Sequence, residues 1–200
     1  MENAARTDQN ELMVLIQKED PDAVARLVKA ELPRVYNLCL KLCLHQSDAE
    51  DLCQEVFVKA FQAVKKFKGD AAFSTWLHRI AINAWKNRVR YEKRRFFGMH
   101  FSLQGPTDAE ENESEIELVD KALRPDQRIE ELENNHFIMK ALDKLNPDDK
   151  IVILLKDIEN RSYEDIAKTM DLNMGTVKSR LFRAREALRE TYRRLGGRYP

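Results

Sequence analysis

The sequence predicts an all-α protein in which two small helical domains are joined by an acidic, flexible linker. Apolar residues recur at helical spacing along most of the chain, and no alternation of apolar and polar residues is long enough to build a sheet. The 200 residues include only 6 glycines and 6 prolines and are 43% hydrophobic, which favours one or two small helix-rich domains. The formal net charge of +0 conceals three segments of strong and alternating charge.

These segments are basic, acidic and basic in chain order. Residues 76–95 carry seven bases against one acid, a net charge of +6, and residues 174–200 carry eight against two, again +6. Between them, residues 107–133 carry eleven acids against three bases, a net charge of −8. Two separate cationic surfaces indicate two contacts with a polyanion, whereas the acidic segment is typical of a linker. The alternative is that each basic stretch is only a solvated helix face.

The first domain is expected over residues 1–97 and begins with two helices. Asp20 and Pro21 supply an N-cap and a proline in the first helical position. Pro33 is then expected to divide that helix from the apolar run VYNLCLKLCL.

The next helix is predicted in SDAEDLCQEVFVKAFQAVKKF. Ser47 and Glu50 have the spacing of a capping box at its start, and Gly69 with Asp70 breaks the helix at its end. Its apolar face is marked by Leu52, Val56, Ala60 and Val64.

Residues 73–95, FSTWLHRIAINAWKNRVRYEKRR, predict a helix that is buried on two sides. One apolar face holds Phe73, Leu77, Ile80 and Ala84, and a second holds Ile82, Trp85 and Val89. The narrow stripe left exposed bears Arg79, Asn83, Lys86, Asn87 and Arg90, with Trp76 on its border. This combination suits single-stranded or partly melted DNA. Cations contact the DNA backbone, an aromatic ring stacks on a base, and amides read exposed base edges. A core helix with a solvated face is the alternative, and we prefer it for Trp85.

The linker is expected over residues 98–130 and the second domain over residues 131–200. The second domain begins with a short amphipathic helix, HFIMKALDKL, and Asn146 starts the next one. Ser162 and Asp165 form a capping box ahead of YEDIAKTM. The segment DLN makes a tight turn before a long final helix.

The turn and the helices beside it predict a helix-turn-helix motif. Two short helices packed across a turn account for the spacing of Ile166, Ala167, Met170, Leu172, Val177 and Leu181. The final helix then exposes near its N-terminal end the residues Lys178, Ser179, Arg180 and Arg183. Arginine binds guanine in the major groove, and Ser or Lys reaches a base or a phosphate. An ordinary helical hairpin is the less favoured alternative.

Other classes of protein have little support in the sequence. His45, His78, His100 and His136 are scattered, and neither HExxH, a P-loop nor a nucleophile motif occurs, so we expect no enzyme, no cofactor and no metal. Cys39, Cys43 and Cys53 form no CxxC motif and are interpreted as reduced core thiols. No membrane span or secretory signal is indicated, so a cytosolic protein without membrane insertion is expected.

Four segments also resemble a known family. They are DAEDLCQEVFVKAF, KFKGDAAFSTWLHRIAINAWKN, LNPDDK in the place of an LPxxxK motif, and SYEDIAKTMDLNMGTVKSRLFRAREAL. In this order and spacing they resemble regions 2 and 4 of the bacterial extracytoplasmic-function (ECF) RNA polymerase sigma factors of the sigma-70 superfamily, most closely the sigma-E-like members. The resemblance covers residues 20–95 and 135–195.

The resemblance implies a protein that binds RNA polymerase core, recognises −35 and −10 promoter elements and nucleates DNA opening. It places contact with the β′ coiled coil of polymerase on Asp51, Gln54 and Glu55, and a second contact on the β flap. It assigns capture of a flipped −10 base to the loop that contains Lys68, Gly69, Asp70 and Phe73, with Asn83 beneath it. It assigns −35 reading to Thr176, Lys178, Ser179, Arg180, Phe182 and Arg183.

The resemblance further implies an anti-sigma partner, a stress or envelope regulon, and a linker that runs through polymerase toward its RNA path. Asp171 and Asn173 depart from the common glycine and proline of the family's turn. Asp tolerates the left-handed conformation, and Asn can cap the final helix. The competing functional class is a helix-turn-helix regulator that binds duplex DNA only.

Overall fold

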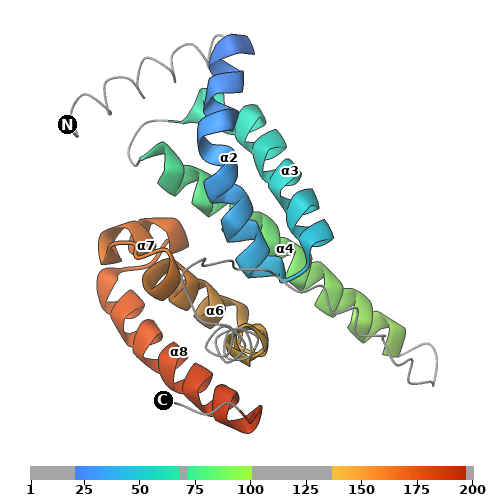
Figure 1. Cartoon of the computed structure of the whole chain (residues 1–200), viewed down its shortest axis with the longest axis vertical. Coiled ribbons are helices and arrows are strands. Elements are labelled where there is room, and N and C mark those ends of the chain that lie inside the picture. The colour runs from blue at the N-terminus through green and yellow to red at the C-terminus, as the bar shows by residue number, and fades with distance from the viewer. Residues whose placement is uncertain (1–20, 68–71, 101–136, 197–200) are drawn as a thin grey trace, which may run out of the picture.

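The computed structural model describes residues 21–67, 72–100 and 137–196. Every regular element in these ranges is a helix, which confirms the predicted all-α class (Figure 1). In the figure α2, α3 and α4 form one group, and α6, α7 and α8 form a second group beside it. We call these groups the N-terminal unit and the C-terminal unit.

The N-terminal unit consists of three helices and a single turn of 3₁₀-helix. Its elements are α2 (Pro21–Cys43), α3 (Gln46–Ala63), η1 (Val64–Lys66) and α4 (Phe73–His100). The apolar face predicted for this segment is buried, since Leu52, Val56 and Ala60 of α3 and Val64 of η1 are each at most 4% exposed. They pack with buried residues of α2 and α4, so one core holds the three helices together.

Pro33 does not divide α2, contrary to the sequence prediction. The helix runs through it from Pro21 to Cys43. A proline inside a helix costs about 3 kcal/mol because it removes one backbone hydrogen bond. Pro33 is exposed, however, while Val35 and Leu38 on the adjoining face are buried. Burying a few side chains of this size, at about 1.5–3 kcal/mol each, outweighs the cost of the proline.

The predicted capping box at Ser47 is also wrong. Helix α3 begins at Gln46, two residues earlier than a helix capped by Ser47 would, and its N-cap residue His45 makes no side-chain capping hydrogen bond. Leu44 has a left-handed φ of 65° and donates its backbone N–H to the carbonyl of Leu40. The sharp reversal after α2 therefore places Ser47 inside the first turn of α3, where it no longer caps the helix.

The prediction that α4 is buried on two sides is confirmed. Leu77 and Ala84 are at most 1% exposed on one face, and Ile82 and Trp85 are 2% and 7% exposed on the other. Trp85 is a core residue, which is the interpretation that we preferred for it. The loop residues Gly69 and Asp70, expected to break the preceding helix, lie outside the described residues.

The C-terminal unit is built from short helices followed by one long helix. Residues 137–143 are helical, and then come α6 (Pro147–Ile153), the π-helix η2 (Leu154–Ile158), α7 (Tyr163–Met170) and α8 (Met174–Arg194). Ser162 Oγ accepts a hydrogen bond from the N–H of Asp165 and donates one to its carboxylate. The residues predicted to pack the helix-turn-helix are buried or partly buried: Ile166, Ala167, Met170, Leu172, Val177 and Leu181.

The turn between α7 and α8 contains Asp171 and Asn173, which were expected to tolerate the left-handed conformation and to cap the final helix. Asp171 adopts the left-handed conformation, with φ 56° and ψ 51°, and ends α7. Asn173 is the N-cap of α8, and its Oδ1 accepts a hydrogen bond from the N–H of Thr176 at 2.8 Å. Both expectations for these positions are therefore confirmed.

Replacing Asn173 with alanine should lower the stability of the C-terminal unit by about 1 kcal/mol, because an N-cap side chain satisfies an otherwise unpaired helix N–H. Urea denaturation followed by circular dichroism measures the change. Asn173→Ser retains a capping oxygen and serves as the control, with most of the stability kept. Equal stability of Asn173→Ala and the unchanged chain would contradict the role of this cap.

Candidate nucleic-acid interface

The exposed stripe predicted on α4 is present, and we call it the α4 stripe: Trp76, Arg79, Asn83, Lys86, Asn87 and Arg90. Arg79, Asn83, Asn87 and Arg90 are exposed, whereas Trp76 and Lys86 are partly buried. The Nη1 group of Arg90 donates to Oδ1 of Asn87 at 3.4 Å. The structure therefore presents cations and amides on one side of a helix whose other sides are packed.

Aromatic rings close the end of the stripe at the start of α4. Trp76 packs against Phe67 and Phe73, with ring centroids 5.2 and 5.3 Å apart. Phe73 is only 4% exposed, so its ring is part of the core of the N-terminal unit. The neighbouring loop residues Lys68, Gly69 and Asp70, assigned to the same site from the sequence, lie outside the described residues.

The second cationic surface lies at the start of α8, and we call it the α8 face: Thr176, Lys178, Ser179, Arg180, Phe182 and Arg183. Phe182 is 69% exposed, and Lys178, Ser179 and Arg183 are also exposed. The hydroxyl of Ser179 donates to the carbonyl of Thr176, and the ammonium of Lys178 lies 5.5 Å from the ring centre of Tyr163. These side chains lie at the N-terminal end of α8, which is capped by Asn173 and held in the core by the buried residues Val177 and Leu181.

One carboxylate of α6 contacts a cation from each surface. Asp148 Oδ1 lies 2.6 Å from Nζ of Lys86, and Asp148 Oδ2 lies 3.1 Å from Nη1 of Arg180. Burial raises the pKa of the Asp148 carboxyl, but the contacts from Lys86 and Arg180 outweigh it and leave the pKa below its usual range. Asp148 is therefore charged at neutral pH and connects the α4 stripe to the α8 face.

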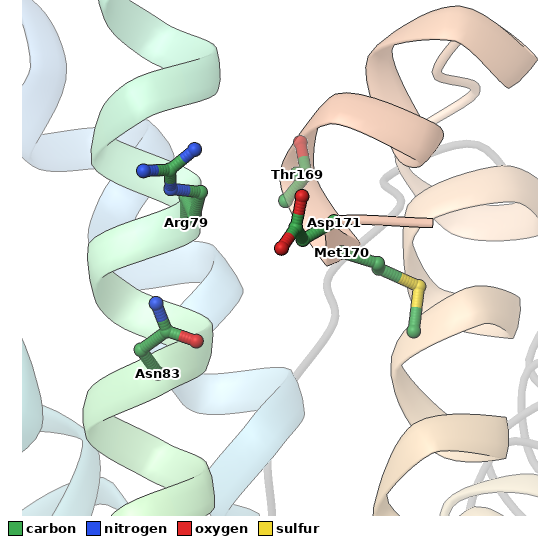
Figure 2. Close-up of a pocket in the computed structure, with 5 residues that line it drawn as sticks. All are labelled: Arg79, Asn83, Thr169, Met170 and Asp171. Carbon is green, nitrogen blue, oxygen red and sulfur yellow. The ribbon is translucent and has the colours of Figure 1, made fainter. Parts of the chain in front are cut away.

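A cavity of about 340 Å³ separates the middle of the α4 stripe from the end of α7. Arg79 and Asn83 line one side, and Thr169, Met170 and Asp171 line the other (Figure 2). The helix-turn-helix turn thus faces the α4 stripe across this space.

A second cross-unit ion pair joins α2 to the residue after η2. Lys41 Nζ lies 2.8 Å from Oε1 of Glu159, and His78 Nε2 lies 3.8 Å from Oε2. Arg161 Nη2 lies 3.0 Å from the same His78 nitrogen. Contacts from His78 and from Lys41 lower the pKa of the Glu159 carboxyl to about 2.

Lys150 of α6 reaches across the same boundary. Its ammonium donates to the carbonyl of Leu42 at 2.8 Å and to Asp143 at 3.0 Å, and it lies 5.3 Å from the ring centre of Trp85. Lys150 is 1% exposed, and this burial lowers its pKa although Asp143 acts in the opposite direction. A buried lysine needs such partners to remain charged.

The acid-and-amide surface expected to contact polymerase lies on α3. Asp51 and Gln54 are exposed. Glu55 is partly buried and pairs with Lys59 at 2.6 Å and with Arg88 at 2.9 Å. Hydrogen bonds from Lys59 and then Arg88 lower the pKa of Glu55. Asp51 and Gln54 are thus open to solvent, while Glu55 is held against α4.

The cysteines are core residues, as the sequence indicated. Cys39 and Cys53 are buried and Cys43 is partly buried, and all three are free. Burial raises the pKa of the Cys43 thiol to about 11, which keeps it protonated at neutral pH. Among the described residues no cluster of three or more His, Cys, Asp or Glu side chains could hold a metal ion. No helix in those ranges is both long and apolar enough to cross a membrane.

Sequence reasoning missed the contact between the two units. Asp148, Glu159 and Lys150 were given no functional role, and His78 was treated as one of four scattered histidines. Asp148 has the pattern of an ordinary acidic residue in a first helical turn, and nothing local distinguishes it. The one available signal was Lys150, a charged residue that precedes the apolar run IVILL.

Two family models match this chain, one over each unit. The family described as Sigma-70 region 2 matches residues 27–95, and the family described as Sigma-70, region 4 matches residues 138–188. The chain is 36% identical to the ECF RNA polymerase sigma-E factor of Escherichia coli K12, over 88% of this chain and 90% of that protein. It is 32% identical to the ECF RNA polymerase sigma factor SigW of Bacillus subtilis, over 90% and 94% of the two chains.

Two solved structures share the fold. One is the sigma factor RpoE of Bartonella quintana in complex with the anti-sigma factor NepR, with a TM-score of 0.63, 24% identity, and coverage of 84% of this chain and 96% of that one. The other is CnrH in complex with the cytosolic domain of CnrY, with a TM-score of 0.61, 22% identity, and coverage of 90% and 93%.

Proposed function

The chain belongs to the ECF RNA polymerase sigma factors of the sigma-70 family, and from this premise we propose how its surfaces divide the work of transcription initiation. Sigma factors bind RNA polymerase core, direct it to −35 and −10 promoter elements and nucleate opening of the DNA. The observation that carries our proposal is the presence of two cationic surfaces, one on each unit, with different chemistry. We propose that the chain itself catalyses no reaction and that polymerase carries out the chemistry.

The α4 stripe is proposed to hold the −10 element as a single strand. Arg79, Lys86 and Arg90 supply cations for the backbone, and Asn83 and Asn87 supply amides for exposed base edges. The loop with Lys68, Gly69 and Asp70, which precedes Phe73, is proposed to receive the flipped base. Base extrusion costs a few kcal/mol, so a site formed in advance by a packed helix lowers the barrier to opening.

The α8 face is proposed to read the −35 element as duplex DNA. A recognition helix enters the major groove with its N-terminal end first, and the exposed residues of this face lie at that end. Arg180 is suited to bidentate contact with guanine, and Lys178 and Arg183 to bases or phosphates. Phe182 offers an apolar contact to a thymine methyl group.

Contact with polymerase is proposed on both units. Asp51, Gln54 and Glu55 of α3 are assigned to the β′ coiled coil, and the C-terminal unit to the β flap. Asp51 and Gln54 support this assignment because they are exposed and make α3 polar on the side opposite its buried face.

The domain limits remain our proposal: region 2 over residues 1–97, a linker over residues 98–130 and region 4 over residues 131–200. The acidic charge of the linker suits a channel that is built to hold nucleic acid. We further propose an anti-sigma partner, a stress or envelope regulon and a cytoplasmic location, where RNA polymerase acts. These last proposals follow from family membership.

Promoter opening is the activity that tests the proposal. Purified chain and core polymerase should transcribe a subset of host genomic fragments, whose start sites are mapped by sequencing the RNA. At such a promoter, thymines near −10 should become reactive to permanganate only when both chain and core are present, because reactivity requires unstacked bases. Core without the chain is the control.

A helix-turn-helix regulator that binds only duplex DNA is the competing candidate. It would protect the upstream element from nuclease without making any thymine reactive. That result would refute the proposed function, provided that the same core polymerase transcribes with another sigma factor.

A further inference from the structure

We propose that Tyr91 of α4 is a stacking residue for an unpaired base of the −10 strand, and that the single-strand site continues past the α4 stripe to Arg94. The proposal rests on the function assigned above to the α4 stripe. It adds the aromatic contact that this function needs, from a residue that belongs neither to the stripe nor to the loop before Phe73.

The first argument is the position of Tyr91 on a part of α4 that extends beyond the core. Trp85 is the last buried residue between Phe73 and Arg95, and Val89 is the last one that packs against the core. Every side chain from Arg90 to Arg95 is exposed, and in Figure 1 this end of α4 extends beyond α2 and α3. A helix end that is exposed on all sides is open to a partner.

The second argument is the charge of this end of the helix. Residues 90–95 carry four bases against one acid, a net charge of +3. Arg90 Nη1 donates to Oδ1 of Asn87 at 3.4 Å, and Arg94 Nε donates to the carbonyl of Arg90 at 3.3 Å. Both acceptors are neutral oxygens of the same helix, so these contacts leave the positive charge in place. The partner that fits this end is a polyanion.

The third argument is the alignment of the ring with the amides of the α4 stripe. Asn83, Asn87 and Tyr91 follow one another at intervals of four residues, which places them along one side of the helix. Tyr91 is 63% exposed. The eight residues from Asn83 to Tyr91 span about 12 Å at the rise of an α-helix. Successive nucleotides of a strand are at least about 3.4 Å apart, so the ring lies within about four nucleotides of the base at Asn83.

The fourth argument is that the α4 stripe otherwise lacks an available ring. Single-strand sites combine cations with aromatic side chains on which bases stack. Trp76 is partly buried and packs against Phe67 and Phe73, with ring centroids 5.2 and 5.3 Å apart. Trp85 is only 7% exposed. Of the aromatic side chains that the structure describes on α4, Tyr91 alone is exposed, and it is therefore the ring that a base can reach.

The surroundings of Tyr91 distinguish it from an ordinary exposed tyrosine. Single apolar side chains are common on protein surfaces and need no explanation. Tyr91, however, continues the line of Asn83 and Asn87, and every other residue from Arg90 to Arg95 is charged. A protein partner would favour apolar neighbours around the ring, since the centre of a protein interface is depleted of charged residues. A nucleic-acid strand suits a ring that is surrounded by cations.

Stacking and edge recognition respond differently to changes in the strand. Every base has a π-face, so a stacking contact tolerates any base but is lost at an abasic nucleotide. The amide of Asn83 instead reads a base edge and depends on the identity of the base. The two contacts can therefore be separated within one oligonucleotide.

The test measures strand affinity on holoenzyme assembled from core polymerase and the full chain at fixed salt. The probe is a fluorescent oligonucleotide with the −10 non-template strand of a mapped promoter, followed by anisotropy. We expect Tyr91→Ala to bind at least about fivefold more weakly, because stacking on one base contributes at least this much to affinity. Tyr91→Phe keeps the ring and should bind within about twofold of the unchanged chain.

An abasic nucleotide placed at each position in turn identifies the base that stacks. At one position, within about four nucleotides of the base read by Asn83, the abasic strand should bind the unchanged chain about fivefold more weakly. Tyr91→Ala should bind this strand and the intact strand equally, because the contact is already absent. Exchange of the base at that position for another base should change affinity by less than about twofold.

Leu32→Ala is the matched control. It removes an apolar side chain that is 43% exposed on α2 of the same unit, and it changes no charge. We expect its strand affinity to equal that of the unchanged chain. Circular dichroism establishes that helix content is retained, and the affinity of each variant for core polymerase is measured separately.

Several outcomes would overturn the stacking contact. A loss in Tyr91→Phe as large as that in Tyr91→Ala would assign the contact to the hydroxyl group. An equal loss in Leu32→Ala would make the effect a general one, and abasic losses that all persist in Tyr91→Ala would leave the ring without a base. Weaker binding of Tyr91→Ala to core polymerase, with unchanged strand affinity of the assembled holoenzyme, would make the ring a protein contact.

The same measurements separate this proposal from the proposed function. If Asn83→Ala weakens strand binding and Tyr91→Ala does not, the assigned role of the α4 stripe stands and only the stacking contact fails. If no form of the holoenzyme binds the strand, the assigned role of the α4 stripe fails and the stacking contact fails with it.

Discussion

Replacing Asn83 with alanine is expected to reduce promoter opening by roughly tenfold or more, while binding to −35 duplex DNA remains nearly unchanged. Asn83 is exposed in the middle of the α4 stripe, so the change removes an amide without opening a cavity in the core. Loss of one or two hydrogen bonds to a base edge is worth about 1–3 kcal/mol, and each 1.4 kcal/mol is a factor of ten.

Two measurements on the holoenzyme separate opening from recruitment. Permanganate reactivity of thymines near −10 reports opening, and nuclease protection of the −35 element reports upstream binding. Asn37→Ala is the matched control, because it removes the same side chain from an exposed position on α2 of the same unit. It should leave both readouts unchanged.

A proportional loss of opening and upstream binding in Asn83→Ala, with normal helix content, would contradict the role assigned to this amide. A loss in Asn37→Ala as large as that in Asn83→Ala would show that the effect comes from the unit as a whole. The contrast between these two asparagines therefore tests the position of the amide on the α4 stripe.

Much of the fold could be predicted because its determinants are local in sequence. The buried face of α3 follows from apolar spacing, and the caps at Ser162 and Asn173 follow from residue type and position. The helix break predicted at Pro33 and the capping box predicted at Ser47 were wrong because both features depend on tertiary packing. The buried face of α2 offsets the cost of the proline, and the reversal at Leu44 determines where α3 begins.

The same distinction explains what was predicted of the site. The exposed positions of the α4 stripe follow from the two apolar faces of one helix, so the sequence alone located Asn83 and Arg79 on one side. The pairing of Lys86 with Asp148 joins residues that are 62 positions apart, and no local pattern encodes it. Lys150 is likewise of a residue type that is usually exposed, and it is buried here because the two units pack together.

The largest effect on stability is expected from Leu181→Ala in α8. Leu181 is 2% exposed and belongs to the same buried cluster as Ile166 and Val177. Removal of a buried leucine side chain costs about 2–5 kcal/mol, because transfer free energy is lost and a cavity remains. Native-state hydrogen exchange should show that the free energy of opening for amides of α7 and α8 falls by this amount. Binding to −35 duplex DNA should weaken as well, because the C-terminal unit is less often folded.

Phe182→Ala is the control for Leu181→Ala. The neighbouring ring is larger than a leucine but 69% exposed, so its removal should change stability by no more than about 0.5 kcal/mol. We nevertheless expect weaker −35 duplex binding, because the ring lies on the α8 face. Leu181→Ala should thus lower both stability and binding, and Phe182→Ala only binding. If Phe182→Ala instead destabilised α8 and left binding intact, the ring would be a packing residue, and the assignment of the α8 face would have to be revised.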